Sequence, residues 1–179
     1  PSRLDVTGRT VGIVGTGNIG RNVAELLSGF RPTILASDPY PNEEWAKDVG
    51  ATYVSLSELC ERSDFITLHA AAGTQLIGAE ELELMKETTV LVNCARGVLV
   101  DNEAAYQAVK EGRIWGYGID EVWTYDHLPL AGLNIIASPH VGSDSDLGKV
   151  GMQLVTAHQV VEFLGGKRPD FVVNQEILS

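Results

Sequence analysis

The sequence predicts an α/β fold, a doubly wound parallel sheet of about seven strands with helices on both faces. Two observations carry this prediction. Short apolar runs rich in Val and Ile alternate with segments of helical periodicity along the whole chain. The first apolar run leads into a glycine-rich turn, Gly15 to Gly20, and an amphipathic segment follows it. Right-handed crossovers between parallel strands then place a ligand crevice at the strands' carboxyl ends.

The glycine-rich turn has the spacing G-x-G-x-x-G, which is typical of dinucleotide binding in a Rossmann-type sheet. Gly15 permits the tight strand-to-helix turn, Gly17 lets the backbone approach a pyrophosphate, and Gly20 lets the helix pack closely on the strand. The free N–H groups and the positive end of the following helix then face the phosphates. A glycine-rich turn can be only a turn, but this one follows a strand pattern and opens a helix. Nucleotide binding is therefore favoured.

The remaining elements follow in regular order. Seven strands are predicted, at 11–14, 33–37, 52–54, 65–68, 90–93, 114–119 and 134–137. Helices are predicted at 18–28, 43–49, 58–62, 79–86, 102–111 and 147–164. Gly50, Gly112 and Gly165 are expected to end helices, and Ser57 to cap the one at 58–62. Residues 167–179 have the proline and polar content of a tail that leaves the domain.

Composition excludes several classes of protein. The formal net charge is −11 and the isoelectric point about 4.7, which argues against nucleic acid or an anionic membrane as a partner. No apolar run approaches the roughly 20 residues that a membrane span needs, and no signal-peptide pattern opens the chain. The two cysteines lack the spacing of a metal site, so we expect a reducing, cytoplasmic setting and no bound metal. Because the chain begins with Pro, we expect it to be part of a longer protein.

Asp38 ends the second apolar run, 18 residues after Gly20. A carboxylate at this point can accept hydrogen bonds from the adenosine ribose hydroxyls, and its charge would repel a 2′-phosphate. NAD is therefore favoured over NADP. The alternative is a solvated turn aspartate before Pro39, which the glycine spacing makes the weaker interpretation.

Polar residues also follow later strands, where this fold places its site. Arg96 follows the fifth strand and could hold a carboxylate in a bidentate fork, although a surface ion pair is an equal alternative. His140 follows the seventh strand and could exchange a proton with a substrate hydroxyl, although a lone loop histidine is more often just surface. Asp120, at the end of the sixth strand, and Asp126, in the next loop, could each orient an imidazole or be solvated.

Several motifs in the same order carry a family resemblance. They are Val11-Gly12-Ile13-Val14-Gly15-Thr16-Gly17-Asn18-Ile19-Gly20, Leu68-His69, Leu91-Val92-Asn93-Cys94-Ala95-Arg96-Gly97, Val100-Asp101, Gly118-Ile119-Asp120, Ser138-Pro139-His140-Val141-Gly142 and Val172-Val173-Asn174. Together they resemble the NAD-binding domain of the D-isomer-specific 2-hydroxyacid dehydrogenases. The resemblance covers essentially the whole chain, so residues 1–179 are interpreted as one NAD-binding domain.

The resemblance implies roles at the substrate. Arg96 matches the arginine that binds the carboxylate of a 2-oxo acid and polarises its carbonyl. His140 matches the acid–base histidine, which protonates the carbonyl oxygen as hydride arrives from NADH and takes the proton back in reverse. Both would lie at the nicotinamide end of the cofactor.

The resemblance also implies roles at the cofactor. Asn18 and Ile19 would cover the pyrophosphate. Cys94, Ala95 and Gly142 would approach the nicotinamide ribose and ring. Asp120 would hold the carboxamide and so fix which face of the nicotinamide meets the substrate.

Two segments depart from the family pattern. The family has a glutamate a few residues after the Asp120 position, and this glutamate pairs with the histidine. Here Asp126 can be aligned in its place, or Tyr125 can, in which case no partner carboxylate remains. The loop 70–74 is shorter than in the family and lacks its proline, at a point that borders the adenosine half of the cofactor.

The prediction is an NAD-dependent oxidoreductase domain that acts on a small D-2-hydroxy or 2-oxo acid. The rival hypothesis is an NAD(H)-binding sensor or corepressor-type module in which catalysis is weak or lost. The resemblance further implies a substrate domain built from flanking segments absent here, so the chain alone is expected to bind cofactor without turnover. It also implies a homodimer formed through this domain.

Overall fold

A computed structural model of the chain describes residues 5–71, 73–121 and 127–172. The chain divides into two compact units, the first ending at His140 and the second beginning at Val141. The expected tail at 167–179 falls in the second unit, and its residues from 173 onward lie outside the described part.

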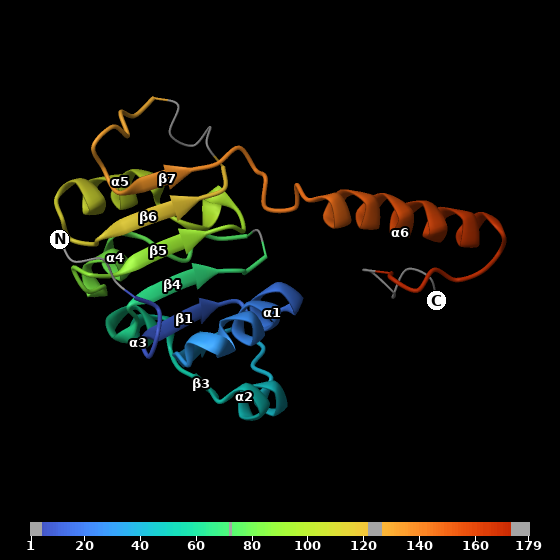
Figure 1. The fold of residues 1–179 in the computed structure, drawn as a ribbon, viewed down its shortest axis with the longest axis horizontal. Coiled ribbons are helices and arrows are strands. Elements are labelled where there is room, and N and C mark those ends of the chain that lie inside the picture. The colour runs from blue at the N-terminus through green and yellow to red at the C-terminus, as the bar shows by residue number, and fades with distance from the viewer. Residues whose placement is uncertain (1–4, 72, 122–126, 173–179) are drawn as a thin grey trace. The chain divides into compact units, whose positions relative to one another are not determined.

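The first unit is built on a sheet of seven strands, all parallel (Figure 1). The strands are β1 (Thr10–Val14), β2 (Thr33–Ser37), β3 (Ala51–Tyr53), β4 (Phe65–Leu68), β5 (Val90–Asn93), β6 (Gly116–Ile119) and β7 (Ile135–Ala137). Their order across the sheet is β3-β2-β1-β4-β5-β6-β7. The chain thus winds outward from β1 in both directions, which confirms the predicted doubly wound sheet and puts its switch point between β1 and β4.

The helices confirm the predicted alternation. They are α1 (Asn18–Leu27), α2 (Glu43–Val49), α3 (Leu56–Arg62), α4 (Ala79–Leu84), α5 (Asn102–Lys110) and α6 (Asp146–Leu164). Gly50 ends α2 in the left-handed conformation with φ 71°. Ser57 does not cap α3: the helix starts earlier, because the Ser55 hydroxyl accepts the Glu58 N–H at 3.1 Å.

Strand β6 is shorter than predicted. Ile114 does not join the sheet, since its N–H turns toward the Ala108 carbonyl at the end of α5. Its side chain is still fully buried, so the apolar pattern correctly identified core residues but not the point at which pairing begins.

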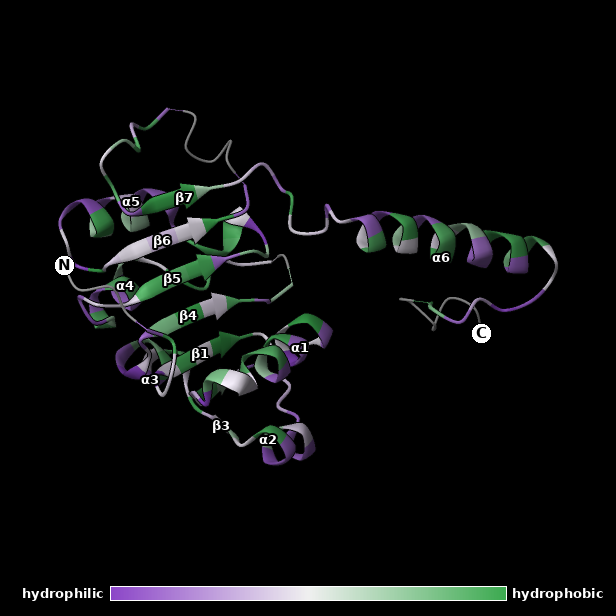
Figure 2. Ribbon diagram, in the orientation of Figure 1, coloured by the Kyte–Doolittle hydropathy of each residue, from purple (hydrophilic) through white to green (hydrophobic). Residues whose placement is uncertain are grey.

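Apolar side chains fill both faces of the sheet. On one face, Val11 and Ile13 of β1 pack with Trp45 of α2 and Ala24 of α1. On the other face, residues of β4 and β5 such as Leu68 pack with α3, α4 and α5. Figure 2 shows β1, β5 and β7 as hydrophobic, β6 as near neutral, and the helices as two-sided, which is the pattern expected of helices covering a buried sheet.

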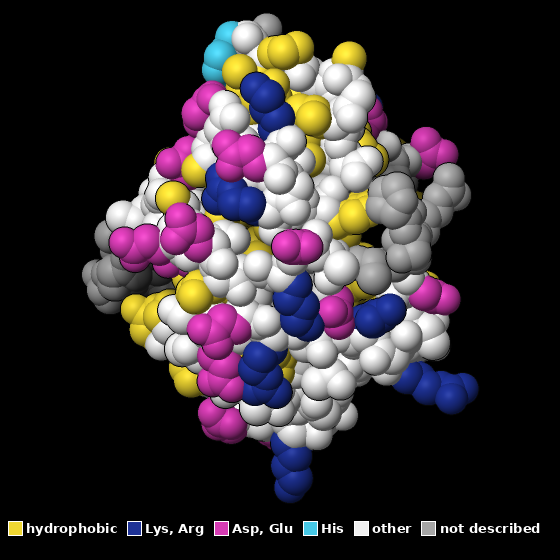
Figure 3. Space-filling view, turned by 90° about the vertical axis from the view of Figure 1, so that its left-hand side faces the viewer, with side chains coloured by type: hydrophobic (Ala, Val, Ile, Leu, Met, Phe, Trp, Pro, Cys, Tyr) yellow, Lys and Arg dark blue, Asp and Glu magenta, His cyan; other side chains and the backbone are white. Residues whose placement is uncertain are grey.

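The amino ends of the strands carry structural ion pairs. Asp64, which precedes β4, accepts the Thr10 N–H at 3.0 Å and a Lys86 ammonium bond at 2.9 Å. Burial disfavours the charge of Asp64, but these partners outweigh it and lower its pKa. Figure 3, which looks onto this side, shows acidic and basic side chains interspersed over it. We find the candidate site at the opposite, carboxyl edge.

The second unit contains α6, whose N-terminus is capped by the Ser145 hydroxyl. None of the α6 residues is buried, and large apolar side chains such as Leu147 and Leu164 are exposed. Within the described residues, no helix is both long and apolar enough to cross a bilayer.

Candidate active site at the carboxyl edge of the sheet

The register of the sheet brings the predicted site residues together. The last paired residues of six strands form one row across the sheet: Ser37, Val14, Leu68, Asn93, Ile119 and Ala137. The residues directly after that row are Asp38, Gly15, His69, Cys94, Asp120 and Ser138. Every loop that the sequence singled out therefore leaves the sheet at the same edge.

Gly15 and Gly20 are required by packing within the protein. Gly15 has φ 89°, and a Cβ built on it would lie 2.5 Å from the backbone nitrogen of Ala70. A Cβ on Gly20 would lie 2.1 Å from the carbonyl oxygen of Gly15. Neither position can hold a side chain without movement of the backbone, because Gly15 lies against the backbone of His69 and Ala70, and Gly20 of α1 lies against the Gly15 carbonyl.

Gly17 differs from both. A Cβ built on it would meet no protein atom within 4 Å, and its φ of −67° is open to any residue. No contact within the described protein therefore calls for glycine here. The space in front of Gly17 is instead open for a ligand that approaches the backbone.

Helix α1 begins without the devices that stabilise the other helix N-termini. Gly17 offers no side-chain cap, and the first turn of α1 contains no acidic residue. Each of the five other described α-helices has an acidic residue in its first turn. Unpaired N–H groups and the helix dipole make such an end attractive to an anion.

Asp38 fastens the glycine turn to the second strand. Its Oδ2 accepts the Thr16 N–H at 2.6 Å and the Thr16 hydroxyl at 3.1 Å, and its Oδ1 accepts the Tyr40 N–H at 2.8 Å. Burial works against ionisation, but these hydrogen bonds and the charge of Arg21 together lower the pKa of Asp38. The carboxylate is therefore ionised at neutral pH.

The Thr16 hydroxyl also contacts the Tyr53 hydroxyl at 2.8 Å, and the Thr16 carbonyl accepts the Arg21 Nε–H at 2.7 Å. Thr16 was not predicted from the sequence as a site residue. The available signal was its position inside the glycine motif. Thr16 is buried, and a buried hydroxyl needs hydrogen-bond partners within the protein.

The loop that carries Arg96 is held at its backbone. The buried Asn93 side chain accepts the Ala95 N–H at 3.1 Å and donates to the Arg96 carbonyl at 2.8 Å. Asn102 donates to the Gly97 carbonyl at 2.8 Å. The Arg96 guanidinium itself is exposed and donates from Nη1 to the Ala95 carbonyl at 2.7 Å.

Asp120 and Cys94 lie at neighbouring strand ends. The Asp120 N–H bonds to the Asn93 carbonyl at 3.1 Å, and the Asp120 carboxylate accepts the Ser138 hydroxyl at 2.5 Å. Partial burial of the sulfur and, to a smaller extent, the Asp120 charge raise the pKa of the Cys94 thiol. Cys94 is therefore a neutral thiol at this edge.

His140 has a left-handed backbone with φ 56°, which is uncommon for a residue other than glycine. Its side chain is 47% exposed, and its Nδ1 lies 4.0 Å from Oε1 of Glu121. The Glu121 side chain is only 16% exposed, and its Oε2 accepts the Gly97 N–H at 2.7 Å. Glu121 thus contacts both the loop of Arg96 and the ring of His140.

Glu121 was not predicted from the sequence. Asp126 and Tyr125 were the two residues that could be aligned beside His140, and both lie outside the described residues. Glu121 follows Asp120 directly, so the available signal was a second acidic residue at a strand end. Gly142 belongs to the second unit, and its position relative to the first unit is not described.

Comparison with known proteins agrees with these features. Residues 1–142 match the family model described as "D-isomer specific 2-hydroxyacid dehydrogenase, NAD binding domain". This chain belongs to that family.

Individual members of the D-2-hydroxyacid dehydrogenase family are similar over nearly all of the chain. A glyoxylate reductase of Korarchaeum cryptofilum is 40% identical over 98% of this chain and 55% of that protein. The apo structure of D-lactate dehydrogenase from Escherichia coli aligns with a TM-score of 0.84 at 30% identity, over 92% of this chain and 54% of that one.

An NAD-complexed D-2-hydroxyacid dehydrogenase from Lactobacillus delbrueckii ssp. bulgaricus aligns with a TM-score of 0.83 at 28% identity, covering 94% of this chain and 57% of that one. The chain thus spans about half the length of the relatives it matches.

NAD is the cofactor of this domain family, and the residues present fit it. The open space at Gly17 and the uncapped start of α1 suit a pyrophosphate, while the ionised Asp38 suits ribose hydroxyls and repels a 2′-phosphate. A metal has no comparable site: the described residues contain no group of three or more His, Cys, Asp or Glu side chains able to hold an ion.

The other histidines have different surroundings. His127 and His158 are exposed and lie 3.9 Å and 3.4 Å from Glu103 and Glu162, respectively. His69 bonds to the Thr67 hydroxyl at 3.0 Å, and burial lowers its pKa. Of these, only His69 lies at the carboxyl edge of the sheet.

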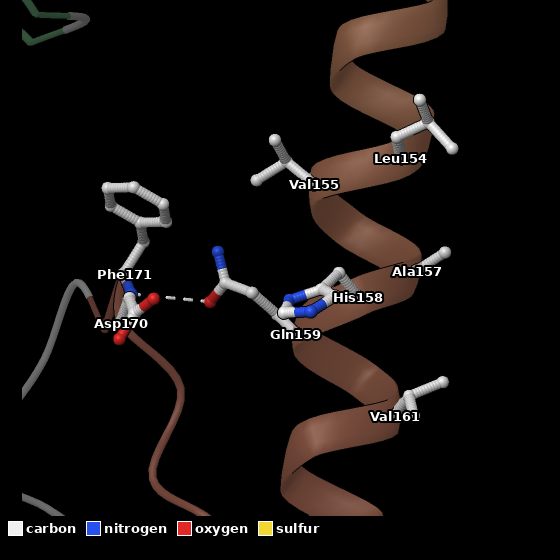
Figure 4. A pocket seen from close by; sticks show the side chains of 8 residues that line it. All are labelled: Leu154, Val155, Ala157, His158, Gln159, Val161, Asp170 and Phe171. Atoms are coloured by element: carbon white, nitrogen blue, oxygen red, sulfur yellow. Dashed lines mark hydrogen bonds between the residues drawn. The ribbon is translucent and has the colours of Figure 1, made fainter.

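A shallow hollow occurs on the second unit of this dehydrogenase domain, between α6 and Phe171 (Figure 4). Aliphatic side chains such as Leu154 and Val155 line most of it, and Gln159 Oε1 accepts the Phe171 N–H at 3.4 Å. It shares no residue with the carboxyl edge of the sheet, and its polar lining residues are His158, Gln159 and Asp170.

Proposed function

We propose that this chain is the NAD-binding part of an oxidoreductase that transfers a hydride between NAD(H) and a small D-2-hydroxy or 2-oxo acid. The observation that carries the proposal is that one carboxylate, Glu121, contacts both the loop of Arg96 and the ring of His140. Glu121 accepts the N–H of the residue after Arg96 and faces the ring of His140. The loop of Arg96 and the ring of His140 therefore meet at the edge that suits the cofactor.

The chain's own residues have separate tasks in this proposal. Asn18 and Ile19, at the start of α1, cover the pyrophosphate, and Asp38 binds the adenosine ribose. Cys94, Ala95 and Gly142 border the nicotinamide, and Asp120 holds its carboxamide. When bound, the cofactor supplies or accepts the hydride at the substrate carbon.

Arg96 binds the substrate carboxylate in a bidentate fork and polarises the neighbouring carbonyl. His140, as the imidazolium, gives a proton to the carbonyl oxygen when the 2-oxo acid is reduced. In the reverse direction the neutral imidazole takes the hydroxyl proton back. A histidine suits both directions because its charge changes near neutral pH.

The names of the relatives favour catalysis over an NAD(H) sensor. The similar proteins are a glyoxylate reductase and a D-lactate dehydrogenase, so glyoxylate and pyruvate are the first substrates to test. We further propose a homodimer formed through this domain and a cytoplasmic location. Free thiols at Cys60 and Cys94 support that location, and a net charge of −11 supports the absence of nucleic acid or anionic lipid as partner.

The test is NADH oxidation by the complete gene product, with glyoxylate and pyruvate as substrates. We expect His140→Gln to reduce kcat by about 100- to 10,000-fold, as for loss of a general acid. Arg96→Gln should weaken the interaction with the carboxylate and reduce kcat/KM by about 10- to 100-fold. Wild-type turnover in both variants would refute the assignment. Light scattering would test the dimer, which a monomer at all concentrations would exclude.

A further inference from the structure

Tyr53 is the last residue of β3 and lies at the carboxyl edge of the sheet, outside the glycine motif. In the sheet it is paired with Ala36 of β2. The strands β3, β2 and β1 are neighbours, so three adjacent strand ends bring together Tyr53, Asp38 and Thr16. A side chain from a strand that carries no part of the glycine motif thus reaches the group that holds Asp38.

The hydrogen bonds of Tyr53 form a chain whose direction is fixed at both ends. At one end, the backbone N–H of Asn42 can only donate, and it donates to the Tyr53 hydroxyl at 3.0 Å. At the other end, the ionised Asp38 carboxylate can only accept, so the Thr16 hydroxyl at 3.1 Å donates to it. Because the Thr16 hydroxyl has a single proton, the 2.8 Å contact between the two hydroxyls is donated by Tyr53. The order is therefore Asn42 N–H, Tyr53 O–H, Thr16 O–H and the Asp38 carboxylate.

This order gives Tyr53 an influence on a carboxylate through a second hydroxyl. Each bond in such a chain polarises the next, so the Thr16 hydroxyl is a stronger donor to Asp38 when it also accepts from Tyr53. The bond from Tyr53 also favours the rotamer in which the Thr16 proton points at Asp38. Thr16 is only 1% exposed, so water has little access to either of its hydrogen bonds.

The other groups that act on Asp38 do not use a hydroxyl. The backbone N–H groups of Thr16 and Tyr40 donate to Oδ2 at 2.6 Å and to Oδ1 at 2.8 Å, respectively. Arg21 of α1 adds a positive charge, and its Nε–H donates to the Thr16 carbonyl at 2.7 Å. Removal of the Tyr53 hydroxyl leaves these interactions in place and therefore tests the hydroxyl chain by itself.

The ring of Tyr53 has a separate, structural contact. It packs edge-on against Trp45 of α2, with the ring centroids 6.1 Å apart and the planes at 60°. Phenylalanine can keep this ring contact and lacks only the hydroxyl. Tyr53→Phe therefore separates the hydrogen bonds from the packing.

We propose that Tyr53 is a positioning residue for cofactor selection, which acts through Thr16 to hold the Asp38 carboxylate in place for the adenosine ribose of NAD. Oδ2 of Asp38 accepts two bonds from Thr16, and Oδ1 accepts the Tyr40 N–H, which leaves acceptor capacity on Oδ1 for a ribose hydroxyl. This inference rests on the proposed role of Asp38 in binding NAD, but the hydroxyl chain can be tested without a ligand.

The first test is Tyr53→Phe in the 179-residue chain. The pKa of Asp38, read from its side-chain carboxyl ¹³C shift during a pH titration by NMR, should rise by about 0.5, because the carboxylate loses part of one hydrogen bond. By fluorescence titration, the affinity for NADH should fall about three- to tenfold, the equivalent of one hydrogen bond between neutral groups. NADPH has a phosphate in place of the 2′-hydroxyl, so its affinity should change less and the preference for NADH should fall.

Variants of Thr16 test whether the effect passes through its hydroxyl. Thr16→Val should raise the Asp38 pKa and lower the NADH affinity at least as much as Tyr53→Phe. Adding Tyr53→Phe to Thr16→Val should cause no further rise in the pKa, because the link between the two residues is already missing. Thr16→Ser keeps the hydroxyl and should restore the wild-type pKa.

The matched control is Tyr106→Phe. It also removes a tyrosine hydroxyl, one that donates to the Pro129 carbonyl at 3.3 Å, and Tyr106 packs in the apolar cluster on the other face of the sheet. Neither the Asp38 pKa nor the NADH affinity should change in this variant.

The inference would be overturned by an unchanged Asp38 pKa or an unchanged NADH affinity in Tyr53→Phe. A further rise in the pKa when Tyr53→Phe is added to Thr16→Val, or equal effects in Tyr106→Phe, would also overturn it. If the wild-type chain binds NADPH as tightly as NADH, the proposed role of Asp38 is refuted instead. The pKa measurements would then still decide whether Tyr53 acts on Asp38 through Thr16.

Discussion

Gly17 and Gly20 belong to one motif but should fail in opposite ways when each is replaced by alanine. A Cβ on Gly20 would lie 2.1 Å from the Gly15 carbonyl, whereas a Cβ on Gly17 meets no protein atom within 4 Å. If Gly17 is glycine for the sake of a bound pyrophosphate, Gly17→Ala should impair binding and leave folding intact. Gly20→Ala should impair folding.

The expected magnitudes follow from these contacts. At Gly17, the lower unfolded-state entropy of alanine gains about 0.4–1 kcal/mol, and the loss of glycine at the helix N-cap costs a similar amount, so stability should change little. At Gly20, overpacking against a backbone oxygen costs about 1–3 kcal/mol, partly offset by the better helix propensity of alanine. For a chain of this length, about 2 kcal/mol corresponds to a fall in Tm of roughly 4–8 °C.

For binding, the methyl group at Gly17 would hold the phosphate away from the backbone N–H groups. The loss of one hydrogen bond to a charged group is worth about 1.5–3 kcal/mol, or a roughly 10- to 100-fold weaker affinity. Thermal unfolding without ligand and NADH fluorescence titration of the 179-residue chain measure the two effects separately. Wild-type NADH affinity in Gly17→Ala, or wild-type Tm in Gly20→Ala, would show that the assignment of the two glycines is wrong.

Three further predictions concern charge. The chain should bind NADH more tightly than NADPH, and Asp38→Asn should reduce that preference by about tenfold; tighter NADPH binding by the wild type would refute the role of Asp38. Asp64→Asn should lower the free energy of unfolding by about 1–2 kcal/mol near neutral pH. Because the folded pKa of Asp64 is lowered, denaturant titrations should show this difference shrinking as pH falls below about 4, and a constant difference would contradict it. Burial lowers the pKa of His69, because the folded state favours the neutral imidazole. The contribution of His69 to the free energy of unfolding is therefore fully present above pH ~6.5 and is lost as the pH falls through the folded pKa. In His69→Gln, the free energy of unfolding should fall less steeply with decreasing pH.

Periodicity identified the sheet because its physical cause is local. A strand buried on both faces must be apolar throughout, so runs such as Ile34 to Ala36 stand out without tertiary information. The ends of elements were less predictable, because they depend on single hydrogen bonds. The Ser55 hydroxyl, rather than that of Ser57, accepts an N–H at the start of α3, and the two serines look alike in the sequence.

The candidate site was likewise predictable from the sequence only in part. The register of a parallel sheet follows from its topology, so residues that end strands were correctly expected at one edge. Glu121 could not be recognised in this way, because its importance comes from the side-chain direction of one residue after Asp120. The family pattern placed the partner of His140 several residues later, whereas in the folded chain Glu121 Oε1 lies 4.0 Å from Nδ1 of the ring.

The features that indicate a ligand are those that lower the stability of the chain when no ligand is bound. Helix α1 begins without a capping side chain or an acidic residue, although the other described α-helices have at least one of these. His140 has a left-handed backbone that a glycine would adopt more easily. Each feature costs on the order of 1 kcal/mol, and each lies at the carboxyl edge of the sheet. Because such costs can be recovered on binding, we expect NADH to raise the Tm of this chain, and Gly17→Ala to abolish most of that increase.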